Sequence, residues 1–361
     1  MSTGGLALLL HPKNQPHTFP GLLTIGKIFY IAELVFFAAI SCAITHRFLR
    51  RPFLVKASLT HPSESLFFAT CFLALASVIG GMHLYGGPVC GPWLVTAFRV
   101  CFWIYFGVTF LVACSSYYLL FSSPALKIND MTPAWDLPIF PFMLSGTLAS
   151  IGAGAMPLAS QTVTMIVAGL TAQGLGLLVS VMMYVMYVHR MIEWGFPSPK
   201  TRPAMFIAVG PPAFTALAII GMADAWPTDT TYFGEDGQAT ANTMKLLAAM
   251  VAVFIWCLAF WFFCIAVIAI VLVAKELTFH LNWWALVFPN VGFTIATIKI
   301  GSVFSSTVVG WVGSIMTVGI SGTYLFVLVM CVRAVLARQI LSEGKDEDTY
   351  FREEKPKERR H

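Results

Sequence analysis

Charged residues are scarce in this sequence. They make up 11% of the chain, whereas a soluble domain normally carries about 25%. Hydrophobic residues make up 58%, and the mean hydropathy is +0.78. This composition excludes an ordinary soluble globular protein and indicates an all-α, polytopic membrane protein, in which every apolar helix faces either lipid or another helix.

Motifs for catalysis and metal binding are also missing. The eight cysteines form no CxxC pair and no Cys/His cluster, which argues against a metal site or a disulfide framework. No GxSxG, HExxH or phosphate-binding loop occurs in a suitable context. We therefore expect no catalytic residue, no metal and no cofactor. The net charge of +5 comes from basic residues in loops and in the tail, so it indicates membrane topology rather than nucleic-acid binding.

Long apolar segments follow one another along the chain. A helix of about 20 apolar residues crosses a bilayer, and the segments that reach this length are 21–46, 63–86, 93–121, 138–157, 160–188, 203–223, 243–274, 280–301 and 303–336. Met1–Leu10 is apolar but too short to cross. Short and long segments alternate, which favours five helical hairpins if Met1–Leu10 is the remainder of a first short helix.

The distribution of basic residues predicts the orientation. Most of the 22 Lys and Arg lie in the loops after the long segments and in the tail: Arg47, Arg50, Arg51, Lys56, Lys127, Arg190, Lys200, Arg202, Lys275, Arg333, Arg338 and the basic residues from Lys345 to Arg360. The positive-inside rule places this set and the C-terminus in the cytosol, and we expect the plasma membrane. Residues 1–341 form the membrane domain, and 342–361 form a charged tail expected to be disordered.

Helix-breaking residues occur inside two of the short segments. Gly210, Pro211 and Pro212 interrupt 203–223, and Pro289 interrupts 280–301. Proline removes a backbone donor, and such breaks are tolerated in a membrane where they line a cavity or are buried in protein. A pore-lining role and a simple packing kink are both open for these residues.

Four ionisable residues lie within or near the apolar segments. Arg99, Lys299 and His83 all fall toward the extracytosolic side, where they would form an electropositive mouth suited to anions. The alternative is that the long basic side chains only snorkel to the interface. Glu33 lies near mid-membrane, and we interpret it as a paired or protonated structural carboxyl rather than a proton relay.

Four motifs resemble those of one family, the tellurite-resistance/dicarboxylate transporter (voltage-dependent anion channel) family. They are MSTGGLA from Met1, HPSESLFF from His61, FIAVGPPAFTAL from Phe206 and WWALVFP from Trp283. The third motif, which contains Thr215, is similar to that of the fungal malic acid permease branch. The resemblance covers roughly residues 1 to 340.

The resemblance implies ten helices arranged as five hairpins around a central pore, with inner odd-numbered helices. It implies that Phe288 occludes the pore, with Phe293 as the alternative one turn on. Gly210, Pro211, Thr215, Pro289, Lys299, Arg99 and His83 are the candidates for the substrate path. It further implies a homotrimer in the lipid bilayer, and malate and other C4-dicarboxylates as substrates. Sulfite or inorganic anion efflux is the alternative within the family.

One departure from the family concerns the first helix, which is apparently truncated. Family members carry a further apolar stretch before the Met-x-x-Gly-Gly motif, whereas this chain starts at that Met. Either the gene start is misplaced or the product lacks half of its first pore helix. Two competing function classes are an integral-membrane enzyme and a non-transporting receptor. An empty path between the odd-numbered helices would favour transport over both.

Overall fold

The computed structural model describes residues 1–53, 55, 58, 64–122, 127–234 and 236–340. The predicted tail 342–361 and the start of the HPSESLFF motif lie outside these residues. Every regular element in the described part of the chain is helical, which confirms the prediction of an all-α polytopic fold. Eight described segments are long and apolar enough to cross a membrane, and α8 is a shorter apolar helix.

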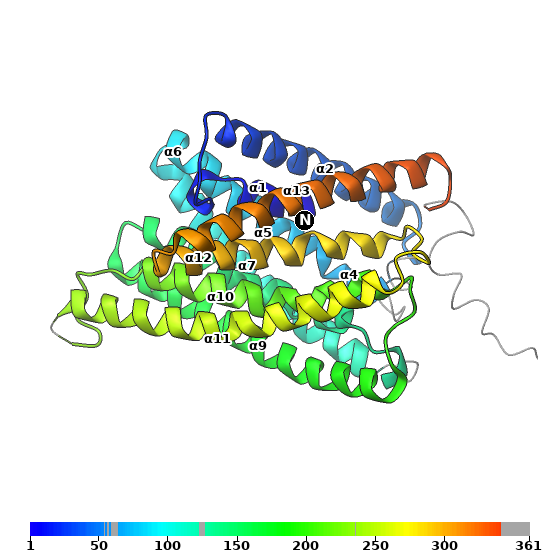
Figure 1. The fold of residues 1–361 in the computed structure, drawn as a ribbon. Coiled ribbons are helices and arrows are strands. Elements are labelled where there is room, and N and C mark those ends of the chain that lie inside the picture. Colours follow the sequence, from blue (N-terminus) through cyan, green and yellow to red (C-terminus); the bar gives the residue numbers. More distant parts are fainter. Residues whose placement is uncertain (54, 56–57, 59–63, 123–126, 235, 341–361) are drawn as a thin grey trace, which may run out of the picture.

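Twelve α-helices of the described part of the chain are labelled in Figure 1 or named below in chain order. Their bounds are α1 (Ser2–Leu9), α2 (Leu22–Arg50), α4 (Glu64–Phe68), α5 (Thr70–Gly81), α6 (Gly87–Cys90), α7 (Pro92–Phe121), α8 (Phe140–Gly152), α9 (Ala159–Trp194), α10 (Gly210–Asp224), α11 (Gly237–Val271), α12 (Phe288–Val303) and α13 (Thr307–Leu336). Figure 1 shows the long helices lying side by side along one common direction.

The helices form an inner ring and an outer layer. In the ring, α1 contacts α5, α5 contacts α8, α8 contacts α10, α10 contacts α12, and α12 returns to α1. Each ring helix also contacts the long helix that follows it, namely α2, α7, α9, α11 or α13. The alternation of short and long segments therefore corresponds to five hairpins with the short helix inside.

Burial separates the two layers. The most apolar window of the Arg202–Asp224 span is 94% buried, whereas that of Leu22–Arg50 is 6% buried and that of Thr307–Leu336 is 17% buried. The outer helices expose large apolar side chains such as Ile28, Phe254 and Leu336. Such a surface would be unstable in water but matches the hydrocarbon core of a bilayer.

Three ring helices begin with the same construction. A 3₁₀ segment comes first, and proline then occupies the first turn of the α-helix: Pro141 in α8, Pro211 and Pro212 in α10, and Pro289 in α12. Proline suits the first turn because the amide there needs no helical acceptor. The expected breaks at Gly210–Pro212 and Pro289 are thus the starting points of α-helices.

Candidate functional site

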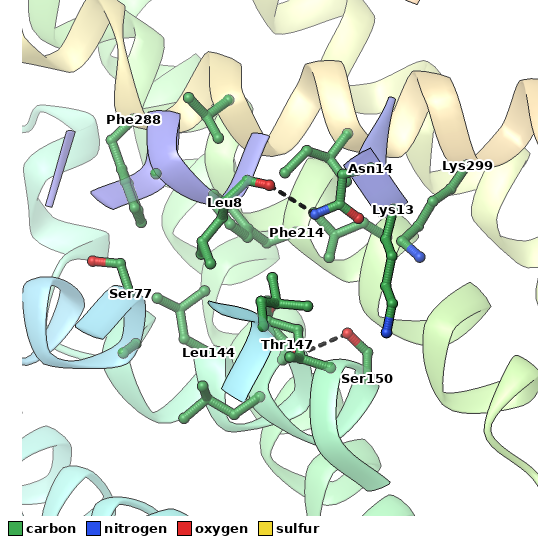
Figure 2. Close-up of a pocket in the computed structure, with 18 residues that line it drawn as sticks. Leu8, Lys13, Asn14, Ser77, Leu144, Thr147, Ser150, Phe214, Phe288 and Lys299 are labelled. Carbon is green, nitrogen blue, oxygen red and sulfur yellow. Dashed lines mark hydrogen bonds between the residues drawn. The ribbon is translucent and has the colours of Figure 1, made fainter. Parts of the chain in front are cut away.

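A cavity of about 280 Å³ lies inside the ring of inner helices (Figure 2). All five ring helices contribute to its wall, together with η2 (Met82–Gly86) and the short 3₁₀ segment η1 (Pro12–Asn14) that follows α1. Its volume is close to the lower limit of the roughly 300–1,000 Å³ of known ligand pockets. The lining residues are Gly5, Leu8, Lys13, Asn14, Ala76, Ser77, Leu84, Leu144, Thr147, Leu148, Ser150, Ile151, Phe214, Leu217, Phe288, Val291, Ile295 and Lys299.

Aromatic rings pack together at one end of the cavity. Phe288, the first residue of α12, is 3% exposed. Its ring stacks on Phe214 with centroids 5.2 Å apart and an interplanar angle of 24°, and the Phe140 ring lies 6.2 Å away. Gly5 of α1 makes room for Phe288, since a Cβ at that position would lie 3.1 Å from its Cδ2. The ring is therefore held between α1 and α10.

Polar groups gather at the opposite end. Figure 2 shows Lys13, Lys299 and Asn14 there, across the cavity from Phe288. The Asn14 amide is held in place because its Nδ2 donates to the Leu8 carbonyl at 2.8 Å. Thr147 is only 7% exposed, and its hydroxyl has no hydrogen-bond partner among the described residues. A buried unpaired hydroxyl is unfavourable unless something in the cavity pairs with it.

The polar end is positively charged. No described carboxylate lies within 4.0 Å of the ammonium group of Lys13 or Lys299. Asp224, exposed at the end of α10, interacts with Lys299 at longer range. Burial, and secondarily the charge of Lys13, lowers the pKa of His11 below its usual value. His11 is therefore neutral at pH 7, and the two lysines supply the positive charge.

Comparison of the sequence with those of known proteins identifies the family to which this chain belongs. The sequence profile described as "Voltage-dependent anion channel" matches residues 1–332. The chain belongs to the voltage-dependent anion channel family. This membership confirms the family resemblance and makes the protein an anion transporter.

The chain is also similar to individual transport proteins over most of its length. The chain is 34% identical to the malic acid transport protein of Schizosaccharomyces pombe over 97% of this chain and 80% of that protein. It is 33% identical to a putative malic acid transport protein of the same organism, over 96% and 80%. It is 22% identical to the sulfite efflux pump SSU1 of Arthroderma otae, over 92% and 88%.

Two of the predicted site residues lie on the wall of the anion transporter's cavity. Phe288 lies at its aromatic end and Lys299 at its polar end. Pro289 fixes the start of α12 next to Phe288. Phe293, the alternative aromatic residue, does not line this cavity: it packs against Trp256 with ring centroids 5.4 Å apart.

The structure does not bring Thr215 to the cavity. Its hydroxyl donates to the Pro211 carbonyl at 2.7 Å and is hydrogen bonded to the Gln173 side chain at 2.8 Å. It therefore faces α9. Gly210 contacts the Phe140 ring instead of lining the cavity, and Pro211 lies beside it in the first turn of α10.

Arg99 and His83 also lie away from Lys299. Arg99 lines a second cavity of about 210 Å³ together with Met156 and Pro157. The His83 ring packs on Phe98 with centroids 4.7 Å apart, and its Nδ1 is buried without a described partner. The predicted cationic mouth is thus divided between different places.

Three residues at the polar end were not singled out from the sequence: Lys13, Asn14 and Thr147. A signal for the first two existed, because they directly follow the short apolar run Met1–Leu10. A basic residue at the end of an inner helix lies at the mouth of whatever the ring encloses. Thr147 gave no such signal, since threonine is common in membrane helices.

Replacing Gly210 should destabilise the aromatic end. In Gly210→Ala, the new Cβ would lie 2.7 Å from Cζ of Phe140, so the ring must move within a packed region. Overpacking of this kind typically costs about 1–3 kcal/mol. We expect a lower melting temperature in detergent. Gly174→Ala is the control, because nothing lies within 4 Å of a Cβ there; equal melting temperatures of the two variants would contradict the close packing.

Proposed function

We propose that the protein carries malate and other C4-dicarboxylates across the membrane, with the cavity as the substrate path. The observation that carries the proposal is the pair of lysines without a neighbouring carboxylate at one end of the cavity. Two ammonium groups match the two carboxylates of such a substrate. The similarity to malic acid transport proteins over nearly the whole chain supports the same substrate class.

The proposal assigns the gate to Phe288. An apolar constriction blocks an ion because it strips away the water that the ion needs. Phe288, Phe214 and Phe140 form such a constriction, and Pro289 fixes the backbone that presents the first of them. An anion held at the lysine end would pass only when the Phe288 ring rotates or the ring of helices widens.

The same proposal includes the membrane, the orientation of the protein in it and the oligomeric state. The apolar outer helices would face lipid, most of the basic loops and the C-terminus would lie in the cytosol, and the membrane would be the plasma membrane. Each subunit of a homotrimer would hold its own pore. The lysine end of the cavity would then open to the extracytosolic side.

Sulfite efflux is the second candidate. The similarity to sulfite efflux pumps also extends over 92% of the chain. A single small anion would engage only part of the polar end, however, and the identity to these pumps is lower than to the malic acid transport proteins.

Uptake of labelled malate into proteoliposomes tests the proposed function. We expect malate flux that depends on the protein and that unlabelled succinate reduces by competition. Sulfite and chloride at the same concentration should compete more weakly. Empty liposomes provide the background. Rapid sulfite flux without malate flux would reject the dicarboxylate assignment in favour of the efflux pump.

A further inference from the structure

The polar end of the cavity contains more than positive charge. Lys13 comes from η1 and Lys299 from α12, so the two ammonium groups approach from separate elements (Figure 2). Asn14 of η1 and Thr147 of α8 also line the cavity. Lys13 is exposed, whereas Lys299 is half-buried, and an ammonium group partly withdrawn from water is favourable only when an anion pairs with it.

We propose that Lys13 and Lys299 form a two-point binding site for a dicarboxylate, in which each lysine pairs with one carboxylate and Thr147 donates its free hydroxyl to the bound anion. This inference rests on the proposed function and deepens it, because it makes Lys13 the residue that distinguishes dicarboxylates from monocarboxylates. A monocarboxylate leaves one of the two ammonium groups unpaired.

Thr147 is the independent observation that points to a ligand. The residue is 7% exposed and lines the cavity, and its hydroxyl oxygen is buried without a partner in the described part of the chain. The neighbouring Ser150 hydroxyl is already used, since it donates to the Thr147 carbonyl at 2.7 Å. A carboxylate oxygen in the cavity would supply the missing acceptor once the Thr147 side chain turns its hydroxyl toward it.

Asp224 places a negative charge near the Lys299 ammonium group. Its carboxylate is exposed at the end of α10 and interacts with Lys299 without reaching ion-pair distance. It therefore competes with a bound anion for the same ammonium group. Removing its charge should strengthen dicarboxylate binding, which is an effect that a misfolded variant cannot imitate.

The test compares malate with lactate, which lacks the second carboxylate. Binding to the purified full chain is measured by titration calorimetry, and uptake is measured in proteoliposomes. We expect Lys13→Gln to weaken malate binding about tenfold, or about 1.4 kcal/mol, and to change lactate uptake less than about twofold. Lys13→Arg should keep most of the malate affinity. Asp224→Asn should bind malate more tightly.

Lys27→Gln is the matched control. Lys27 is exposed on α2 near the same end of the bundle but does not line the cavity. Long-range attraction is screened within about 8 Å at physiological salt, so at that ionic strength Lys27→Gln should bind malate like the parent protein. An equal loss for Lys27→Gln and Lys13→Gln would show that the lysines only attract anions at a distance.

Three further outcomes overturn the two-point site. They are an equal loss of malate and lactate in Lys13→Gln, unchanged malate binding in Lys13→Gln, and unchanged or weaker binding in Asp224→Asn. The proposed function fails separately: if the parent protein binds malate but does not transport it, dicarboxylate transport is rejected, while the loss of binding in Lys13→Gln still supports the site.

Discussion

Phe288→Ala should raise malate flux per folded protein roughly tenfold, which corresponds to lowering the barrier by about 1.4 kcal/mol. The ring lies between Gly5 and Phe214 at one end of the cavity, so if it is the gate, its removal opens an apolar constriction through which water and the anion can pass. Pro289 still fixes the start of α12, because the substitution leaves the backbone unchanged. Flux in proteoliposomes, normalised to folded protein by size-exclusion chromatography, measures the effect.

Phe293→Ala is the matched control for the gate. Phe293 lies on the same helix and is 2% exposed, compared with 3% for Phe288, but it packs on Trp256 outside the cavity. Truncating a packed phenylalanine typically costs about 3–5 kcal/mol in soluble cores. We expect Phe293→Ala to reduce folded yield with no gain in flux. If Phe288→Ala behaves the same way, the ring is a packing residue and the gate assignment is wrong.

Asp136→Asn should remove a large pH dependence of stability. Asp136 is fully buried before α8; its Oδ2 accepts a hydrogen bond from Ser180 at 2.9 Å, and its Oδ1 has no described partner. Burial raises the pKa of this carboxyl from 3.8 to about 7. Between these values the folded protein binds a proton that the unfolded chain has lost. Stability therefore falls as pH rises from about 4 to 7, by roughly 4 kcal/mol at most.

Melting temperatures in detergent between pH 4 and 8 check this prediction. The asparagine of the variant keeps an oxygen that can accept from Ser180 but has no charge to bury, so the variant should lose the part of the pH dependence that Asp136 contributes and its stability should fall less steeply across this range. At pH 8 the variant should be the more stable protein. Tyr117 and Tyr184 also interact with Asp136, but phenols ordinarily titrate near pH 10. Asp229→Asn, at an exposed position, should keep the parent's pH dependence; a curve for Asp136→Asn that runs parallel to the parent's would refute the assignment.

The arrangement of the helices could be predicted because lipid imposes strong rules on length and composition. Short segments such as 203–223 became inner helices and long ones such as 243–274 became outer helices, as the alternation indicated. The site was harder to predict. Position along a helix gives the depth of Arg99 or His83 in the membrane, but it does not tell which face of the helix is turned toward the ring.

Thr215 illustrates the same limit. It follows Pro211 by one helical turn in a motif that resembles a family signature, yet its hydroxyl bonds back to the Pro211 carbonyl and faces Gln173. Lys13 shows the opposite error. Its place after the apolar run Met1–Leu10 was a signal that went unused, and the packing of α1 into the ring places η1 at the mouth of the cavity. Contacts between hairpins determine both outcomes, and these contacts are long-range in sequence.

The two ends of the cavity have different consequences for kinetics. The lysine end reaches the surface through the exposed Lys13, whereas Phe288 is buried at the other end. If Phe288 is the gate, as proposed, an anion at rest in the cavity would exchange with one compartment only, and the occupancy of the closed protein would follow the concentration on that side. Changes among the lysines would then alter half-saturation, and changes among the aromatic rings would alter turnover. Saturation measured from the two faces of the membrane should consequently differ, even when the net driving force is the same.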